Sequence, residues 1–318
     1  MPIQKSGRIP AIDQFRGFAI ILMVLVNYLS GIQTIPAYLK HVPDIGMNFP
    51  DLGAPVFIFA IGLTYGMSFR RRRAQDGLPA ALGHFLRRYL AFIGIGAVIT
   101  AGQTLLGREL ELMDWGVLQA IGAAGLLTLI VIWLPTGPRL FVGLALLALY
   151  QALLDCCWLD LVLGSQHGGL IGSLSWAALL ILATVMGDIY QEPGQQRYFP
   201  WISLALLAGG FLLAFLVPVS KNRVSATYDL ITLGFSGAIF SVFYRAKFNL
   251  GFFSAWGRNP LLLYLAAFLV TGLFALPGGA GWYILAPLWL VSLQMLALLF
   301  SLSALALYLE KKGLIFSM

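Results

Sequence analysis

The residues best suited to chemistry in this 318-residue chain precede its second long apolar run. His41 lies ten residues before Asp51 in the stretch AYLKHVPDIGMNFPDLGAPVFIFAIG, which also contains Asp44. A histidine takes and returns a proton near neutral pH, and a carboxylate can hold its ring in one tautomer. Asp51 also needs a polar partner, because an apolar run follows it. The pattern has two interpretations: a catalytic histidine oriented by a carboxylate, or a solvated histidine in a loop.

A second set of polar residues lies in the first apolar run, RIPAIDQFRGFAIILMVLVNY. Asp13 and Arg16 are three residues apart and share one face of a helix, whereas Asn27 lies deeper in the same run. Strongly polar groups at membrane depth are costly, so each is a functional candidate. An interfacial ion pair and an interhelical amide bond are the structural alternative.

The remaining candidates are basic or amide groups near the ends of apolar runs. Arg88 follows a run of arginines that suits anionic lipid headgroups or a phosphate-rich cofactor. Arg258 and Asn259 precede a run whose first turn offers free amide donors to an anion, although plain capping explains them equally well. Lys221 and Asn222 precede another run, where a solvated loop is the alternative.

The composition restricts the elements that must position these residues. Apolar residues make up 59% of the chain, charged residues 10%, and the mean hydropathy is +0.86, whereas soluble proteins carry roughly 25% charged residues. This excludes a water-soluble domain, and with it the basic surface of a nucleic-acid-binding protein. Cys156 and Cys157 are adjacent, which suits neither a disulfide framework nor a zinc site. No ligand spacing indicates a metal or redox cofactor.

Apolar runs bounded by charges, glycine and proline predict an all-α, polytopic membrane bundle of about ten helices. No linker is long enough to divide it, so we expect one transmembrane domain over residues 1–318. The ten expected spans are Gly17–Ser30, Leu52–Phe69, Tyr89–Leu105, Trp115–Leu134, Leu140–Leu154, Leu170–Tyr190, Trp201–Val219, Tyr228–Tyr244, Pro260–Leu276 and Tyr283–Leu307.

The distribution of lysine and arginine predicts the orientation of these spans. Sixteen of the 20 fall in alternate loops on one side and four on the other, and such residues are retained in the cytoplasm. Both termini are therefore expected in the cytoplasm of a cell (inner) membrane protein, with His41 on the outer side. The chain lacks the GxxxxGK[ST], GxSxG and HExxH signatures of ATP-driven transport, serine hydrolysis and zinc proteolysis.

A series of motifs resembles one known family over almost the whole chain. In order they are DQFRGFAIILMVLVNY, YLKH, PDLGAPVFIFAIG, WGVLQAIG, PVSKNRVSATYDLITLG and GRNPLLLYL. They resemble the catalytic membrane domain of heparan-alpha-glucosaminide N-acetyltransferase and its bacterial relatives in the transmembrane acyltransferase superfamily. The resemblance implies an acetyl-CoA-dependent N-acetyltransferase, of the EC 2.3.1 type. Cytoplasmic acetyl-CoA would be the co-substrate, and an amino sugar or glycan on the other side would be the acceptor.

The resemblance also assigns roles to individual residues. His41 falls on the catalytic histidine, Asp51 on its carboxylate and Asn27 on the asparagine that helps to hold the acetyl carbonyl. The residues near family positions that meet the phosphates of CoA are Arg8, Arg16 and Arg88, and those matching an outer Lys-Asn element at the acceptor side are Lys221 and Asn222.

Two other functions stay open. Polysaccharide O-acyltransferases of related families tend to carry their histidine inside the first helix, where this chain has Asn27 and Tyr28. A transporter or flippase would use the same polar residues to line a pathway, with His41 as a gate or proton relay. The oligomeric state is also open, with a homodimer as one option. Ala120 stands where the family commonly has a basic residue, so the acceptor is left undetermined.

Overall fold

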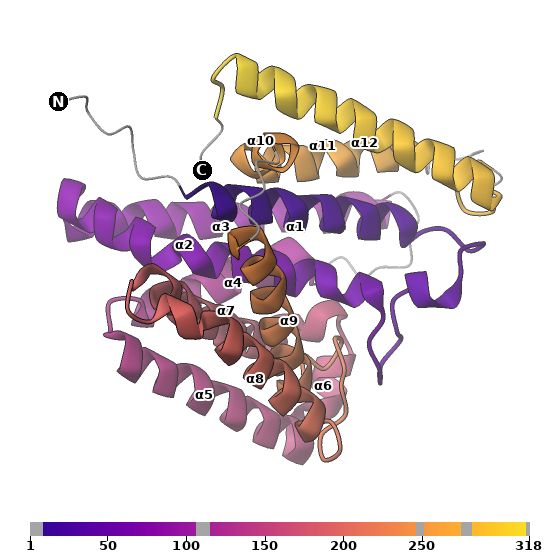
Figure 1. Ribbon diagram of the computed structural model, residues 1–318. Helices are drawn as coiled ribbons and strands as arrows, with labels where there is room; N and C mark the ends of the chain where they lie inside the picture. The colour runs from indigo at the N-terminus through magenta and orange to yellow at the C-terminus, as the bar shows by residue number, and fades with distance from the viewer. Residues whose placement is uncertain (1–8, 106–114, 246–250, 275–281, 316–318) are drawn as a thin grey trace. The chain divides into compact units, whose positions relative to one another are not determined.

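The computed structural model describes residues 9–105, 115–245, 251–274 and 282–315 (Figure 1). These residues are mostly helical and include no β-strand, which confirms the expected all-α class. The helices are α1 (Pro10–Leu29), α2 (Gly53–Asp76), α3 (Leu78–Leu105), α4 (Val117–Val131), α5 (Thr136–Leu153), α6 (Leu159–Leu163), α7 (Gly169–Gln191), α8 (Phe199–Leu213), α9 (Ala226–Arg245), α10 (Gly251–Arg258), α11 (Pro260–Phe274) and α12 (Leu288–Lys311).

Seven stretches of the described chain are helical, long and apolar enough to cross a membrane, as expected for a multi-pass protein. They are Pro10–Leu29, Phe49–Asp76, Leu78–Gly102, Thr136–Leu163, Gln166–Gln191, Ala226–Arg245 and Leu288–Lys311. Three of the ten expected spans fall instead on α4, α8 and α11, which have 15 residues each. Such a helix is about 22 Å long, shorter than a hydrocarbon core of about 30 Å. The count of ten therefore stays a prediction.

Several helices differ from the expected spans at their ends; α3, for example, begins at Leu78 and not at Tyr89. α2 does not stop at Phe69 but continues to Asp76 through the arginine run, because arginine is a good helix former. The fifth span was expected to end at Leu154. A π-helical turn, Leu154–Trp158, joins α5 to α6 there, and one apolar stretch results over Thr136–Leu163.

The chain forms two compact units. Unit 1 comprises Met1–His41, Asn48–Gly53 and Ile239–Met318, and unit 2 comprises Val42–Met47 and Ala54–Ala238. The chain therefore passes between the units in the connection from α1 to α2 and at the start of α2, and again within α9.

Unit 1 is built on α1, which lies beside α10 and α11 (Figure 1). The crossing of α1 and α10 is very close, because a Cβ atom added to Gly17 would stand 1.9 Å from the carbonyl oxygen of Phe253. A Cβ at Gly257 would meet the carbonyl oxygen of Asp13 at the same distance. Small residues allow such approaches between membrane helices, so the glycine of the FRG motif has a packing role.

Unit 2 is built around α7. The apolar stretch that contains α7 is 83% buried, whereas those of α3 and α5 are 28% buried. α7 packs against α4 and α5, and it meets α2 where a Cβ at Gly62 would lie 2.4 Å from that of Ala183. The exposed apolar sides of α3 and α5 suit contact with lipid, because a water-soluble protein rarely leaves such large patches uncovered.

Candidate functional site

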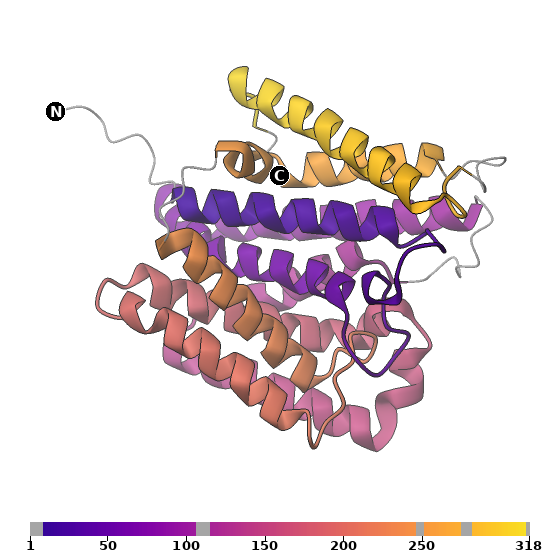
Figure 2. The same cartoon turned by 45° about the vertical axis from the view of Figure 1, so that its right-hand side comes forward.

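The connection between α1 and α2 runs through several turns (Figure 2). Within it, the imidazole of His41 contacts the carboxylate of Asp51. The Nδ1 atom of His41 lies 2.7 Å from Oδ1 of Asp51. The side chain of Asp51 is fully buried, whereas that of His41 is 33% exposed. A shielded carboxylate thus bonds an imidazole that solvent or a substrate can reach.

The Asp51 carboxylate is held by a helix-capping arrangement. Its Oδ2 atom accepts a hydrogen bond from the backbone N–H of Asn48 at 2.9 Å, at the start of the 3-10 turn Phe49–Leu52. The Asn48 side chain donates to the carbonyl of Lys40 at 2.9 Å and to that of Ala37 at 3.1 Å. Asn48 therefore fixes the carboxylate and also the segment that leads into His41. Asn48 was not among the residues predicted from the sequence, although Asn-x-x-Asp is a recognisable capping pattern.

This geometry determines which nitrogen of the imidazole is basic. When the ring is neutral, Nδ1 carries the proton and donates it to Asp51, so Nε2 is the nitrogen with a basic lone pair. Such an atom can take a proton from an attacking amine or hydroxyl, or can itself attack a carbonyl carbon.

Asn27 lies on α1, on the same end of that helix as the Asp51 turn. Gly53 follows the turn, and a Cβ atom there would lie 3.7 Å from a methyl carbon of Val26. The Asn27 side chain shares a hydrogen bond with the hydroxyl of Tyr264 on α11. Tyr264 is 4% exposed and was not identified from the sequence, since only the fold brings α1 and α11 together.

Tyr28, which follows Asn27, anchors this end of α1. Its hydroxyl donates to Oε1 of Gln294 on α12, and its backbone carbonyl accepts from the hydroxyl of Tyr283 at 2.6 Å. These bonds fix the height and rotation of the helix that carries Asn27.

Two of the predicted anion-binding arginines lie near the opposite end of α1: Arg16 on α1 itself and Arg258 on α10. Nη1 of Arg16 lies 3.5 Å from Oδ1 of Asp13, and Nη1 of Arg258 lies 2.9 Å from Oε1 of Glu310. The close approach of Gly257 to Asp13 places both arginines at this end of unit 1. The Nε atom of Arg258 is buried and has no hydrogen-bond partner among the described residues.

Two further residues were predicted to bind the anionic donor, Asn259 and Arg8. The Asn259 side chain is buried and donates to the carbonyl of Leu314 at 3.0 Å, so it ties the start of α11 to the segment after α12. Arg8 lies outside the described residues.

Arg88 belongs to unit 2, on α3. It is half-buried, its guanidinium carbon lies 5.8 Å from the centre of the Tyr89 ring, and its Nε atom is buried with no hydrogen-bond partner in the described part of the chain. An orphaned guanidinium nitrogen is the type of donor that a phosphate group satisfies.

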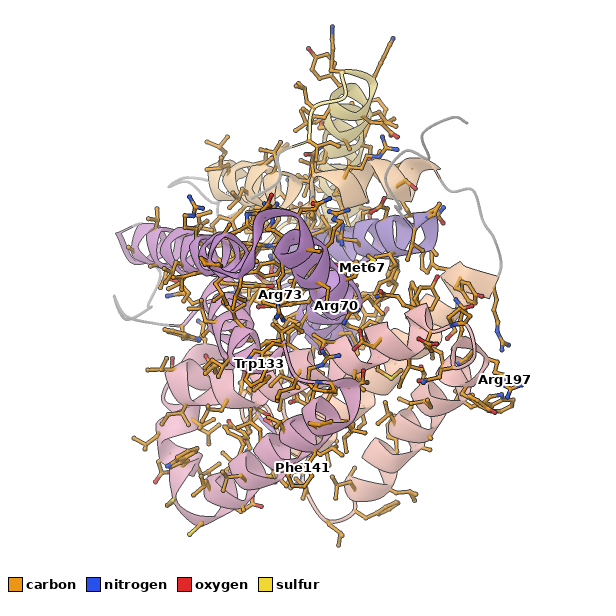
Figure 3. All side chains as sticks on the ribbon, turned by 90° about the vertical axis from the view of Figure 1, so that its left-hand side faces the viewer. Met67, Arg70, Arg73, Trp133, Phe141 and Arg197 are labelled. Carbon is orange, nitrogen blue, oxygen red and sulfur yellow. The ribbon has the colours of Figure 1, made fainter. Side chains whose placement is uncertain are left out.

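A network around Asp188 lies among the basic residues of unit 2. Asp188 accepts from Arg70 at 3.0 Å, from Thr136 at 3.0 Å and from Arg139. Figure 3 shows three arginines of unit 2: Arg70 and Arg73 lie on α2, and Arg197 lies apart from them. Arg139 is only 1% exposed. Its positive charge is therefore compensated by Asp188 and by hydrogen bonds to the carbonyls of residues 132 and 134.

Lys221 and Asn222 lie in a turn of unit 2 just before α9. Lys221 is 8% exposed, and the side chain of Asn222 donates to the carbonyl of Pro43. Neither environment is that of the fully solvated loop considered as the alternative.

Asp44, which the sequence placed in one cluster with His41, binds this turn instead. Its carboxylate accepts two hydrogen bonds from Arg223, one of them 2.7 Å long, and one from Ser220 at 3.0 Å. The bond from Arg223 is the main reason that the pKa of Asp44 is lowered, and the Ser220 bond and the Arg223 charge lower it further, against the effect of burial. Asp44 therefore serves to attach its segment to Arg223.

Comparison with known proteins adds a family to this geometry. The model of the family described as heparan-alpha-glucosaminide N-acetyltransferase, catalytic, matches residues 8–267. The heparan-alpha-glucosaminide N-acetyltransferase of Mus musculus is 32% identical over 126 residues, which cover 37% of this chain and 18% of the mouse protein. That of Homo sapiens is 34% identical over 123 residues, covering 36% and 17%. The matched segment thus spans less than a fifth of each relative.

Proposed function

The chain belongs to the heparan-alpha-glucosaminide N-acetyltransferase catalytic family, and on this premise we propose that it is a membrane acyltransferase. In this proposal it moves an acetyl group from acetyl-CoA to an amino sugar or glycan acceptor. The observation that supports the proposal most directly is the 2.7 Å contact between His41 and Asp51. A solvated loop histidine would need no buried carboxylate, and burying a carboxylate is costly unless it has such partners.

In the proposed reaction the acceptor nitrogen attacks the thioester carbonyl of acetyl-CoA. A C–N bond forms, the C–S bond breaks, and the amine proton passes to Nε2 of His41, from which it can reach the departing thiolate. Asp51 stabilises the imidazolium that forms in between. Asn27 donates to the developing oxyanion, a type of contact worth about 2.7 to 4 kcal/mol elsewhere. In a second route, Nε2 of His41 attacks the thioester carbonyl first, the C–S bond breaks and the thiolate leaves; the acceptor nitrogen then attacks the acetyl group on His41, and the bond to Nε2 breaks.

We assign the donor phosphates to arginines. Arg258 and Arg88 each keep a buried Nε atom without a partner among the described residues, and Arg16 lies at the same end of unit 1 as Arg258. Asn259 supports the start of α11 beside Arg258. Arg8 is included on the family resemblance alone.

The acceptor and the topology are also part of the proposal. We assign Lys221 and Asn222 to acceptor binding, as the resemblance implies. The excess of lysine and arginine in alternate loops supports cytoplasmic termini in a cell membrane, with the acceptor outside. We propose that residues 1–318 act as one catalytic domain of about ten membrane spans, in which the 15-residue helices α4, α8 and α11 count as short spans.

Donor binding and acyl transfer can be tested separately in protein purified in detergent. We expect calorimetry to show binding of acetyl-CoA by the wild type and by His41→Ala, whereas transfer of labelled acetyl groups to amino sugars is lost in His41→Ala. His167→Asn is the matched control, because His167 has a φ of 53° and asparagine tolerates this left-handed conformation.

Each outcome has a clear meaning. Transfer by His41→Ala would remove the histidine from the mechanism. Folded protein that binds neither acetyl-CoA nor desulfo-CoA would contradict the acyltransferase and favour the transporter. Label retained on the wild-type protein without acceptor, and absent from His41→Ala, would select the acetyl-histidine route over direct transfer.

A further inference from the structure

Unit 2 contains a buried carboxyl group that the proposed chemistry does not use. Asp229 lies in the first turn of α9 and is 1% exposed. Its Oδ2 atom lies 2.9 Å from the hydroxyl of Ser175 on α7. Its Oδ1 atom is buried and has no hydrogen-bond partner within the described ranges.

Among the described residues, none places a positive charge beside Asp229. Ser175 faces it from α7, and Tyr150 on α5 interacts with it electrostatically. The hydroxyl of Tyr150 donates to the carbonyl of Arg223 at 2.8 Å, while the guanidinium of Arg223 binds Asp44. No lysine, arginine or histidine in the described part of the chain pairs with Asp229. An ionised carboxylate in such a place would be uncompensated.

The number of protons available at Ser175 also indicates that Asp229 is not ionised. The Ser175 hydroxyl is 2.7 Å from the carbonyl oxygen of Val224 and 2.9 Å from Oδ2 of Asp229. A hydroxyl has one proton to donate, and a carbonyl oxygen has none. Both short contacts can therefore be full two-centre hydrogen bonds only if Ser175 donates to Val224 and Asp229 itself supplies the proton for the other contact.

Val224, whose backbone carbonyl accepts the hydrogen bond from Ser175, has an unusual backbone conformation. Its φ is 48°, in the left-handed region that β-branched residues rarely adopt, and such a residue persists only where its surroundings hold it. Val224 ends the turn that contains Lys221 and Asn222. The Ser175 bond to its carbonyl and the Tyr150 bond to the carbonyl of Arg223 support this turn from α7 and α5.

We infer that Asp229 is a protonated, neutral carboxylic acid that donates to Ser175, so that Ser175 holds Val224 and thereby positions the Lys221–Asn222 turn. Loss of the proton would redirect the Ser175 hydroxyl to the carboxylate and release the carbonyl of Val224. Asp229 is thus a positioning residue that acts through Ser175. Its importance for acceptor binding rests on the proposed function, whereas its protonation and its effect on the turn do not.

Infrared spectroscopy tests the protonation directly. At neutral pH the wild type should show a carboxylic-acid C=O band that shifts in heavy water and on incorporation of isotope-labelled aspartate. Asp229→Asn should lose that band, because its amide replaces the acid as the donor to Ser175. A wild-type spectrum without a protonated aspartate band would overturn the inference even if no variant folds. So would a band that persists unchanged in Asp229→Asn.

Hydrogen exchange tests the effect on the turn. In Ser175→Ala the amides of residues 219–229 should exchange roughly 5- to 10-fold faster, as expected for the loss of one hydrogen bond, whereas Asp229→Asn should keep the wild-type pattern. Unchanged exchange in Ser175→Ala would refute the positioning role.

A kinetic measurement connects the turn to the acceptor. For active protein, Ser175→Ala should raise KM for the acceptor while kcat and acetyl-CoA binding stay near wild type. An unchanged KM would show that the turn has no role in acceptor binding. If the wild type transfers no acetyl group, the proposed function fails, but the infrared and exchange results still decide this inference.

Discussion

Asp51 in unit 1 and Asp229 in unit 2 are both 1% exposed, yet their surroundings are opposite. Each carboxylate oxygen of Asp51 has a nitrogen partner, His41 on one side and the backbone of Asn48 on the other. Asp229 has one hydroxyl partner, and its second oxygen has none among the described residues. Donors favour the ionised form of a carboxyl group and isolation favours the neutral form. Burial alone therefore does not reveal what a carboxyl group does; its donors do.

The largest effect expected from this comparison is at Asp51. Asp51→Asn removes the charge that holds Nδ1 of His41 and stabilises its protonated form, so we expect kcat to fall by roughly 10²- to 10⁴-fold. Acetyl-CoA binding should be retained. Acetyl transfer is measured for Asp51→Asn beside Asp160→Asn, a control at an exposed residue of α6.

The same substitution at Asp229 sharpens the contrast. Asp229→Asn keeps a donor for Ser175, so its turnover should fall far less than that of Asp51→Asn. Equal losses at the two positions would show that both carboxyl groups act in the same way and would break the comparison.

Asp188 adds a third kind of carboxylate, 13% exposed, which compensates arginines. Asp188→Ala leaves Arg139, which is 1% exposed, without its ion-pair partner. The removal of one member of a buried pair typically costs about 3 to 5 kcal/mol. We expect a clearly lower midpoint of thermal unfolding in detergent.

The control for Asp188 is Asp76→Asn. Asp76 pairs with Arg72 at 3.5 Å, and the side chains are 47% and 42% exposed, so this change should cost no more than about 0.5 kcal/mol. A similar loss of stability in both variants would contradict the distinction between the two pairs.

The sequence predicted what depends on local patterns. Helices occur where the apolar runs predicted them. The runs did not predict how far each helix extends, because arginines prolong α2 and a π-turn joins α5 to α6. His41 and Asp51 were recognisable because they share one short connection.

Polar pairs that join distant helices could not be predicted in this way. Arg139 and Asp188 are 49 residues apart, and Ser175 and Asp229 are 54 residues apart. Each member alone resembles an ordinary polar residue near a helix end, and only packing of α7 against α5 and α9 gives it a partner. Asp44 shows the same limit, because it lies three residues from His41 in the sequence, whereas its donors come from a turn nearly 180 residues later.

The smallest expected effect is at Asp44, whose carboxylate is paired but partly exposed. Arg223 lowers the pKa of Asp44 through hydrogen bonds and charge. A carboxyl group with a lowered pKa in the folded protein stabilises it fully above its unfolded pKa of about 3.9, and this contribution is lost as the pH falls through the folded pKa. The side chains of Asp44 and Arg223 are 32% and 18% exposed, so solvent screening limits the effect to about 1 kcal/mol.

Thermal unfolding of the wild type and of Asp44→Asn, followed from about pH 6 to about pH 3, measures the contribution of the ionised Asp44 carboxylate to stability, because an aspartate carboxyl group titrates near or below about pH 4. The variant should be slightly less stable at the higher pH, and the two curves should converge as the wild-type carboxylate becomes protonated. A stability difference that stays constant over this range would mean that Asp44 holds its segment through neutral hydrogen bonds. It would then differ from Asp51 and Asp188 in requiring no charge at all.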